Sequence, residues 1–168
     1  IAIGFGIIMG LPLGLLAAYK KHSWIDFLCM SFAVTGVSLP NFMVASLLVL
    51  VFSVHLNLLP PALWDGWSSA VLPILTLSVR PLALIARVVR TSCIETLGSD
   101  YIRTARAKGL SEFKIIAKHS LRNAILPMIT LLGPLTAAII TGSFVVEVMF
   151  AIPGLGRHFV SAVIDRDY

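Results

Sequence analysis

The residue types that most often carry out chemistry are scattered along this chain. Its histidines are His22, His55, His119 and His158, and its two cysteines are Cys29 and Cys93. Their spacing matches no metal-ligand pattern, and no Ser/His/Asp, HExxH or phosphate-loop signature is present. The sequence therefore predicts no catalytic residues and no metal site, and it shows no machinery for hydrolysing ATP or a peptide bond.

Three polar residues in or beside apolar stretches are candidates for lining a passage or for packing. Arg80, next to Pro81, lies near the middle of one stretch, where a charge is expensive and indicates function. The alternative is that Arg80 extends its charged end to the membrane surface. Asn41 follows Pro40 in another stretch, where it could satisfy backbone groups that proline frees or line a passage. Glu147 lies at the end of a third stretch, where we expect it at the membrane–water interface.

The composition indicates the class of protein to which these residues belong. Of the 168 residues, 58% are hydrophobic and 12% are charged, against about 25% charged in soluble domains. A disordered segment, a disulfide scaffold and a soluble enzyme are thereby excluded. A membrane-spanning helix needs about 20 apolar residues, so the uncharged runs predict an all-α integral membrane protein with spans near 1–19, 28–54, 70–89 and 124–147. Because the chain opens without Met inside an apolar run, we expect a fragment of a longer polypeptide.

The positive charges predict which loops share a side of the membrane. Eight of the 13 basic residues lie between Arg87 and Arg122, and Lys20-Lys21 form the other cluster. The loop 55–69 has no Lys or Arg. Basic loops stay in the cytoplasm, so we expect both clusters inside, with 55–69 and the final segment 148–168 outside. The basic window lacks an aromatic stacking platform, and topology explains its charge better than nucleic-acid binding does.

Small residues recur at a spacing of four in the first span: Ala2, Gly6, Gly10, Gly14 and Ala18. This spacing places them along one face of a helix, where they let a second helix approach closely. The sequence predicts that this face packs against another helix.

The segment 90–123 is longer than a bare connection between spans requires. Asp100 can cap a helix that ends at Gly109, where a positive φ is accessible. A second, amphipathic helix follows with Ser111 as its cap; one face carries Leu110, Phe113, Ile116, Ala117 and Leu121, and another carries Lys114 and Lys118. Such a helix either lies on the membrane surface or docks into a groove of a soluble partner.

These stretches resemble the permeases of binding-protein-dependent ABC transporters of the type I fold. In the family's general loop pattern only Ala105, Gly109 and Leu121 match, and the proline comes later, as Pro127. RTARAKGL, HxLRNAxLP and TGSxVVExxFxxPGLGRxFVxAxxxRDY are similar to the dipeptide/oligopeptide importer branch, and the resemblance covers essentially the whole chain.

The resemblance implies a type I helical bundle, here with about four spans and cytoplasmic coupling helices, that forms half of a peptide passage. It implies a second permease subunit, two ATPase subunits that bind the ATP, and an extracytoplasmic peptide-binding protein, with no cofactor in this chain. The residues expected to dock on an ATPase are Arg103, Thr104, Ala105, Arg106, Gly109, Leu110, Ser111, Glu112, Phe113 and Lys114. An external lip is expected at Pro153, Gly154, Gly156 and Phe159.

Other functions remain open at the level of sequence. Relatives in this branch also carry nickel or glutathione. A secondary transporter or channel would need no ATPase, and helices broken at Pro40 and Pro81 are compatible with one. An intramembrane enzyme would need paired catalytic groups at one depth, whereas the sequence offers isolated ones.

Overall fold

The computed structural model describes residues 1–63, 66–140, 144–152 and 154, and within these ranges the regular structure is helical throughout. The first half contains α1 (Ala2–Tyr19), α2 (Trp24–Ser38), α3 (Asn41–Leu48) and the π-helical η1 (Val49–His55). The second half contains α4 (Trp67–Leu97), α5 (Asp100–Ala107), α6 (Glu112–Lys114), the π-helical η2 (Ile115–Ser120), α7 (Leu121–Ile140) and α8 (Phe144–Met149). The prediction of an all-α protein is confirmed.

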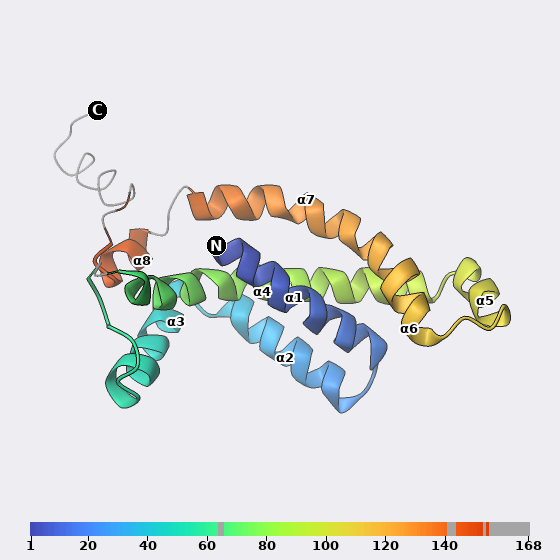
Figure 1. Ribbon diagram of the computed structural model, residues 1–168, viewed down its shortest axis with the longest axis horizontal. Coiled ribbons are helices and arrows are strands. Elements are labelled where there is room, and N and C mark those ends of the chain that lie inside the picture. Colours follow the sequence, from blue (N-terminus) through green and yellow to red (C-terminus); the bar gives the residue numbers. More distant parts are fainter. Residues whose placement is uncertain (64–65, 141–143, 153, 155–168) are drawn as a thin grey trace.

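The long helix α4 is the axis around which the other helices pack. Figure 1 shows α1, α2 and α7 running beside α4, and each of them contacts it. The main buried cluster contains Ile85, Val89 and Cys93 of α4 together with Ala18 of α1 and Met128 of α7. The side chains of α4 therefore form the centre of the core.

The small-residue face of α1 packs directly on α4, as the spacing of four predicts. A Cβ added at Gly10 would lie 2.7 Å from the carbonyl oxygen of Leu82, and one at Gly14 would lie 2.5 Å from that of Ala86. A Cβ at Gly6 would lie 2.9 Å from the Cβ of Pro81. Glycine is needed at these positions because the backbones of the two helices nearly touch.

Two long helices contain the expected spans 1–19 and 70–89 almost completely, and the helices at the other two expected spans have a different course. Among the described residues, α1, α4 and the continuous helix Glu112–Ile140 are long and apolar enough to cross a membrane. The expected span 28–54 is instead the pair Trp24–Ser38 and Asn41–His55, bent by 110°. Pro40 breaks the helix at this point, because it has no N–H and restricts Leu39 before it to extended backbone (φ −75°, ψ 128°).

The end of the expected span 124–147 also differs from the prediction. The helix α7 ends at Ile140, and α8 is a separate helix after residues that lie outside the described ranges. At its other end the helix extends back to Glu112, so the second loop helix is continuous with α7. Pro127 and Pro134 lie inside α7 without ending it.

The two basic clusters lie at the same end of the bundle. A pocket of about 320 Å³ is lined by Tyr19 and Lys21 at the end of α1 and by Arg106 and Glu112 of the loop. Figure 1 shows α5 and α6 at this end and α8 at the opposite end of α4. The placement of this end of the bundle in the cytoplasm stays a prediction.

Candidate functional site

The loop between α4 and α7 begins with a short helix whose two ends are fixed by its backbone. The N-cap is Ser99, in extended backbone, and Asp100 is the first helical residue rather than the cap predicted from sequence. At the other end Gly109 has φ +78°. The Gly109 N–H donates to the Arg106 carbonyl at 2.9 Å, and the Leu110 N–H donates to the Ala105 carbonyl at 3.3 Å. This pair of bonds is the motif in which a left-handed glycine ends a helix, as predicted for Gly109.

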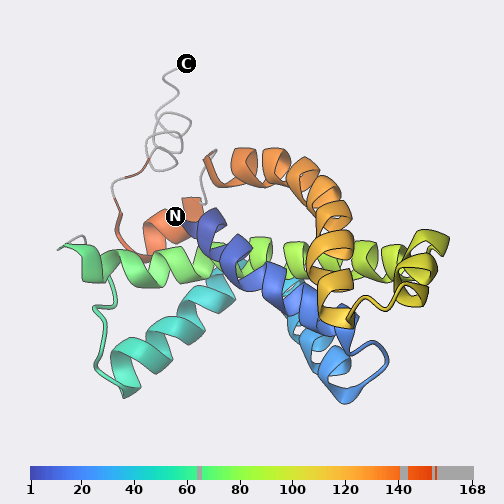
Figure 2. The same ribbon diagram turned by 45° about the vertical axis from the view of Figure 1, so that its right-hand side comes forward.

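The loop is packed against the end of α4. Ile102, Ala105 and Ile115 form a buried cluster with Leu97 at the end of α4. The Ser120 hydroxyl donates to the Cys93 carbonyl at 3.3 Å, which attaches η2 to α4. The loop therefore has its own small core and a fixed position on the bundle. Figure 2 shows α5 at one end of α4, joined by a short connection to the helix that leads into α7.

An ion pair joins the two halves of the loop across the Gly109 turn. Arg106 of α5 donates from Nε to Glu112 Oε1 at 2.6 Å and from Nη2 to Glu112 Oε2 at 3.1 Å. The bidentate contact with this carboxylate raises the pKa of Arg106 above its ordinary value. Both side chains are nearly half exposed, so the pair orients the turn while adding little stability.

The exposed surface of the loop differs in part from the face expected from sequence. Phe113 is 80% exposed and Leu110 is 38% exposed, whereas Ile115 is fully buried. Of the ten residues expected to dock on an ATPase, nine are exposed: Arg103, Thr104, Arg106, Gly109, Leu110, Ser111, Glu112, Phe113 and Lys114. Ala105 is 7% exposed and supports the loop from inside. The loop thus presents an aromatic side chain on a rigid support.

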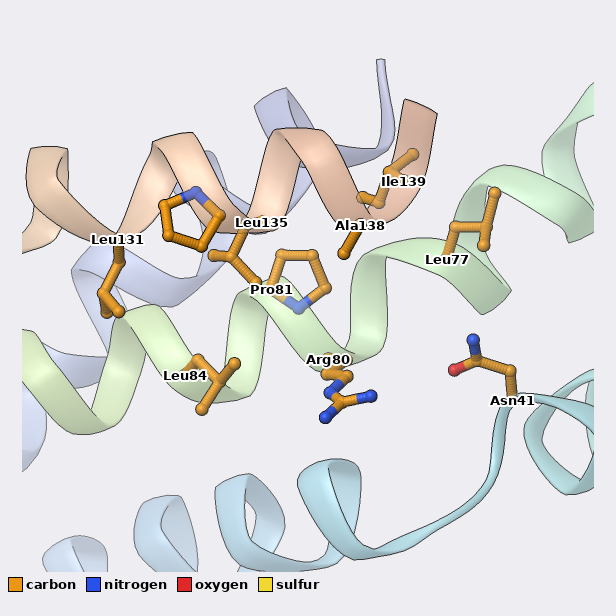
Figure 3. A pocket seen from close by; sticks show the side chains of 10 residues that line it. Asn41, Leu77, Arg80, Pro81, Leu84, Leu131, Leu135, Ala138 and Ile139 are labelled. Carbon is orange, nitrogen blue, oxygen red and sulfur yellow. The ribbon is translucent and has the colours of Figure 1, made fainter. Parts of the chain in front are cut away.

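A second candidate site is a pocket of about 280 Å³ between α3, α4 and α7. Asn41, the first residue of α3, and Arg80, in the middle of α4, both line it, so the structure unites two of the three passage candidates. The rest of the lining is apolar: Leu77, Pro81, Leu84, Leu131, Pro134, Leu135, Ala138 and Ile139. Figure 3 shows Arg80 between α4 and the α2–α3 break, with Asn41 at that break.

The third passage candidate, Glu147, lies elsewhere. It belongs to α8, whose Val146 packs with Ala45 of α3 and Leu72 of α4. The Glu147 carboxyl lies against Gly154, from the segment expected to form an external lip. The other expected lip residues, Pro153, Gly156 and Phe159, lie outside the described residues.

Sequence reasoning missed an ion pair between Asp26 and Arg90. In the sequence Arg90 is one of the eight basic residues between Arg87 and Arg122, and its spacing does not link it to Asp26. The structure brings Arg90 Nε to 2.6 Å from Asp26 Oδ1, and the Asp26 side chain is 7% exposed. A signal was available, because Asp26 is the only acidic residue in the first 64 positions. Within the described part of the chain no three His, Cys, Asp or Glu side chains gather as metal ligands.

The family model described as the binding-protein-dependent transport system inner membrane component matches residues 10–168. The chain belongs to this family. Its fold is accordingly that of the type I ABC-transporter permeases, as the sequence resemblance predicted.

Curated relatives in this permease family are similar over nearly the whole chain. A dipeptide transport system permease protein, DppB of Bacillus subtilis, is 53% identical over 167 residues, which cover 99% of this chain and 54% of the relative. An oligopeptide transport system permease protein, OppB of Haemophilus influenzae, is 46% identical over 170 residues (100% and 56%). OppB of Escherichia coli is 43% identical over 169 residues (99% and 55%). The chain spans about half the length of these relatives.

Proposed function

We propose that this chain forms membrane-spanning helices of an ATP-driven importer for dipeptides or oligopeptides in the bacterial plasma (inner) membrane. It lines half of the passage, and a second permease subunit lines the other half. Two ATPase subunits bind the ATP, and an extracytoplasmic binding protein delivers the peptide. The loop 90–123 faces the cytoplasm, and the segment 148–168 faces outward. The similarity to permeases named for dipeptide and oligopeptide transport supports this choice of substrate.

The observation that carries the proposal is the exposure of Phe113 on a loop that is otherwise fixed. Phe113 is 80% exposed, two residues before the fully buried Ile115. An apolar side chain on a rigid helix end is suited to a groove on a soluble partner. The Arg106–Glu112 pair holds the Gly109 turn in place. Motion of the partner would therefore be passed on to the helices and would not be lost in deformation of the turn. We assign this surface to an ATPase subunit.

The transport step follows from two alternative packings of the helices. ATP binding closes the ATPase dimer and displaces the loop, and the bundle then opens to the other side of the membrane. The loop is attached to α4 through Ile102, Ile115 and Leu97, so its displacement acts on the helix around which α1, α2 and α7 pack. Gly109 fixes the angle between α5 and the following helix.

The alternatives to this function are a different cargo for the same importer and a transporter of a different class. Nickel as cargo is disfavoured because the charge in the central pocket is that of Arg80, which attracts anions and repels cations; glutathione, a peptide with carboxylates, is compatible with it. A secondary transporter or channel needs no ATPase, so this function would leave the exposed Phe113 on its fixed loop unexplained.

The test uses the subunit as its host expresses it, together with the products of the neighbouring genes, and purifies the assembly through a tag on this subunit. We expect ATPase subunits to co-purify and Phe113→Ala to reduce their amount several-fold, because the variant removes the docking side chain. Phe32→Ala is the matched control: Phe32 is 55% exposed but lies on α2. Equal ATPase content in the Phe113→Ala variant and the control would reject the docking role.

A further inference from the structure

Arg80 lies far from both ends of α4. Thirteen residues separate it from Trp67 and seventeen from Leu97, which correspond to about 20 and 26 Å along a helix. An arginine side chain is far shorter than either distance. Among the described residues no hydrogen bond or ion pair to Arg80 is formed. Arg80 is exposed on this chain, and a charge inside an apolar span requires a partner.

The surroundings of Arg80 are complementary to the end of a peptide. Its guanidinium can donate two parallel hydrogen bonds to a carboxylate, and the Asn41 amide in the same pocket is a further donor. Pro81 has no N–H to give to the carbonyl of Leu77, the residue four positions earlier. Leu77 also lines the pocket, and its carbonyl lacks this helix hydrogen bond.

The size and walls of the pocket select which part of a solute fits. Its volume of about 280 Å³ lies just below the range for whole small-molecule ligands, and it suits one terminal residue. The walls from Leu84, Leu131 and Leu135 are apolar and offer no polar partner that would discriminate among side chains. A site of this kind recognises the terminal group of a peptide and tolerates different side chains on its terminal residue.

We propose that this pocket receives the C-terminal carboxylate of the peptide during transport, with Arg80 as its ionic partner and Asn41 as a second donor. The inference rests on the proposed function and adds the chemical group that the permease itself recognises. Asn41 begins α3 directly after the 110° bend. A change in that bend would separate Asn41 from Arg80 and weaken the site. Such a weakening would allow the peptide to leave the pocket.

The test is competition between two forms of one uncharged tripeptide, the free acid and the C-terminal amide, for uptake into proteoliposomes that hold the complete transporter and its binding protein. The isotopic ratio of the two imported peptides gives the preference for the acid. Because the binding protein is the same in all samples, a change in this ratio between variants reports on the permease. We expect Arg80→Gln to reduce the acid preference about tenfold or more and Arg80→Lys to reduce it less.

Arg87→Gln is the matched control, because Arg87 is an exposed arginine of the same helix outside the pocket. An unchanged ratio in Arg80→Gln, or equal loss of both peptides from an assembled complex, would overturn the proposal and indicate a role in packing against the second permease. If Arg80→Gln fails to assemble, Asn41→Ala must shift the ratio in the same direction. Absence of any peptide uptake by the wild type would instead refute the proposed function.

Discussion

Arg90 and Asp26, 64 residues apart, form a bidentate ion pair with distances of 2.6 Å from Nε to Oδ1 and 2.7 Å from Nη2 to Oδ2. The His22 N–H donates to the same Oδ2 at 3.0 Å, and the Ser23 hydroxyl accepts from the Asp26 N–H. The pair fixes the start of α2 on the last part of α4. It lies near the end of the bundle that carries the loop, so it helps to hold the helix that the loop acts on.

Removal of one partner of this pair should destabilise the protein. Asp26→Asn leaves Arg90 without its anion, and breaking a buried pair costs about 3–5 kcal/mol; because Arg90 is 24% exposed, we expect about 1–3 kcal/mol. Thermal unfolding of the detergent-purified transporter measures the loss. Asp100→Asn is the control, since it breaks an exposed pair with Arg103 and should leave the midpoint unchanged. Equal midpoints for both variants would contradict the structural role of Asp26.

The α1–α4 contact predicts a difference between two glycines of one helix. Gly14→Val places a side chain where the Ala86 carbonyl and Val89 already lie, whereas Gly4 has open space around it. We expect Gly14→Val to separate the helices and to lower stability by about 3 kcal/mol or more, and Gly4→Val to have little effect. The yield and melting temperature of the two variants provide the comparison, and similar values would argue against this packing.

The positive φ of Gly109 predicts a graded series at one position. The added Cβ meets no neighbour within 4 Å, so backbone conformation alone limits the substitution. Gly109→Asn should retain coupling because asparagine tolerates this region, and Gly109→Val should not, because β-branched residues avoid it. The readout is peptide imported per ATP hydrolysed, with membrane insertion intact. Equal coupling in both variants would show that the angle between the two loop helices is unimportant.

The Arg106–Glu112 pair should affect coupling more than stability. Because both side chains are nearly half exposed, Glu112→Gln should change the melting temperature little. The turn should nevertheless become less ordered, which we expect to appear as faster amide exchange at Gly109 and Leu110 and as a lower ratio of transport to ATP hydrolysis. Glu95→Gln, an exposed glutamate on α4, is the control. Unaltered exchange in Glu112→Gln would count against the role of the pair in ordering the turn.

Features that depend on local spacing were predictable from the sequence. The glycines of α1 repeat every four residues, and this repeat alone identifies the face that meets α4. Gly109 was identifiable because a helix signal stops there and few other residues adopt its φ. The identity of the partner helix and the distance between the backbones came only from the structure.

Features that depend on the relative placement of distant segments were not predictable. Asn41 and Arg80 were each singled out, but their common pocket depends on the 110° bend after α2, an angle that Pro40 permits without setting. The Asp26–Arg90 contact likewise requires α2 and α4 to lie side by side. The helix 112–140 was expected to be divided, but a π-helical segment joins its parts and the helix continues past Pro127 and Pro134.

The most direct test of the account measures ATP hydrolysis and peptide uptake together in proteoliposomes that contain the transporter purified through this subunit. We predict that binding protein loaded with peptide raises ATP turnover, that peptide accumulates in proportion, and that Phe113→Ala abolishes the link while Phe32→Ala does not. Uptake of solute by a preparation that contains no ATPase subunit would contradict the account and favour a secondary transporter.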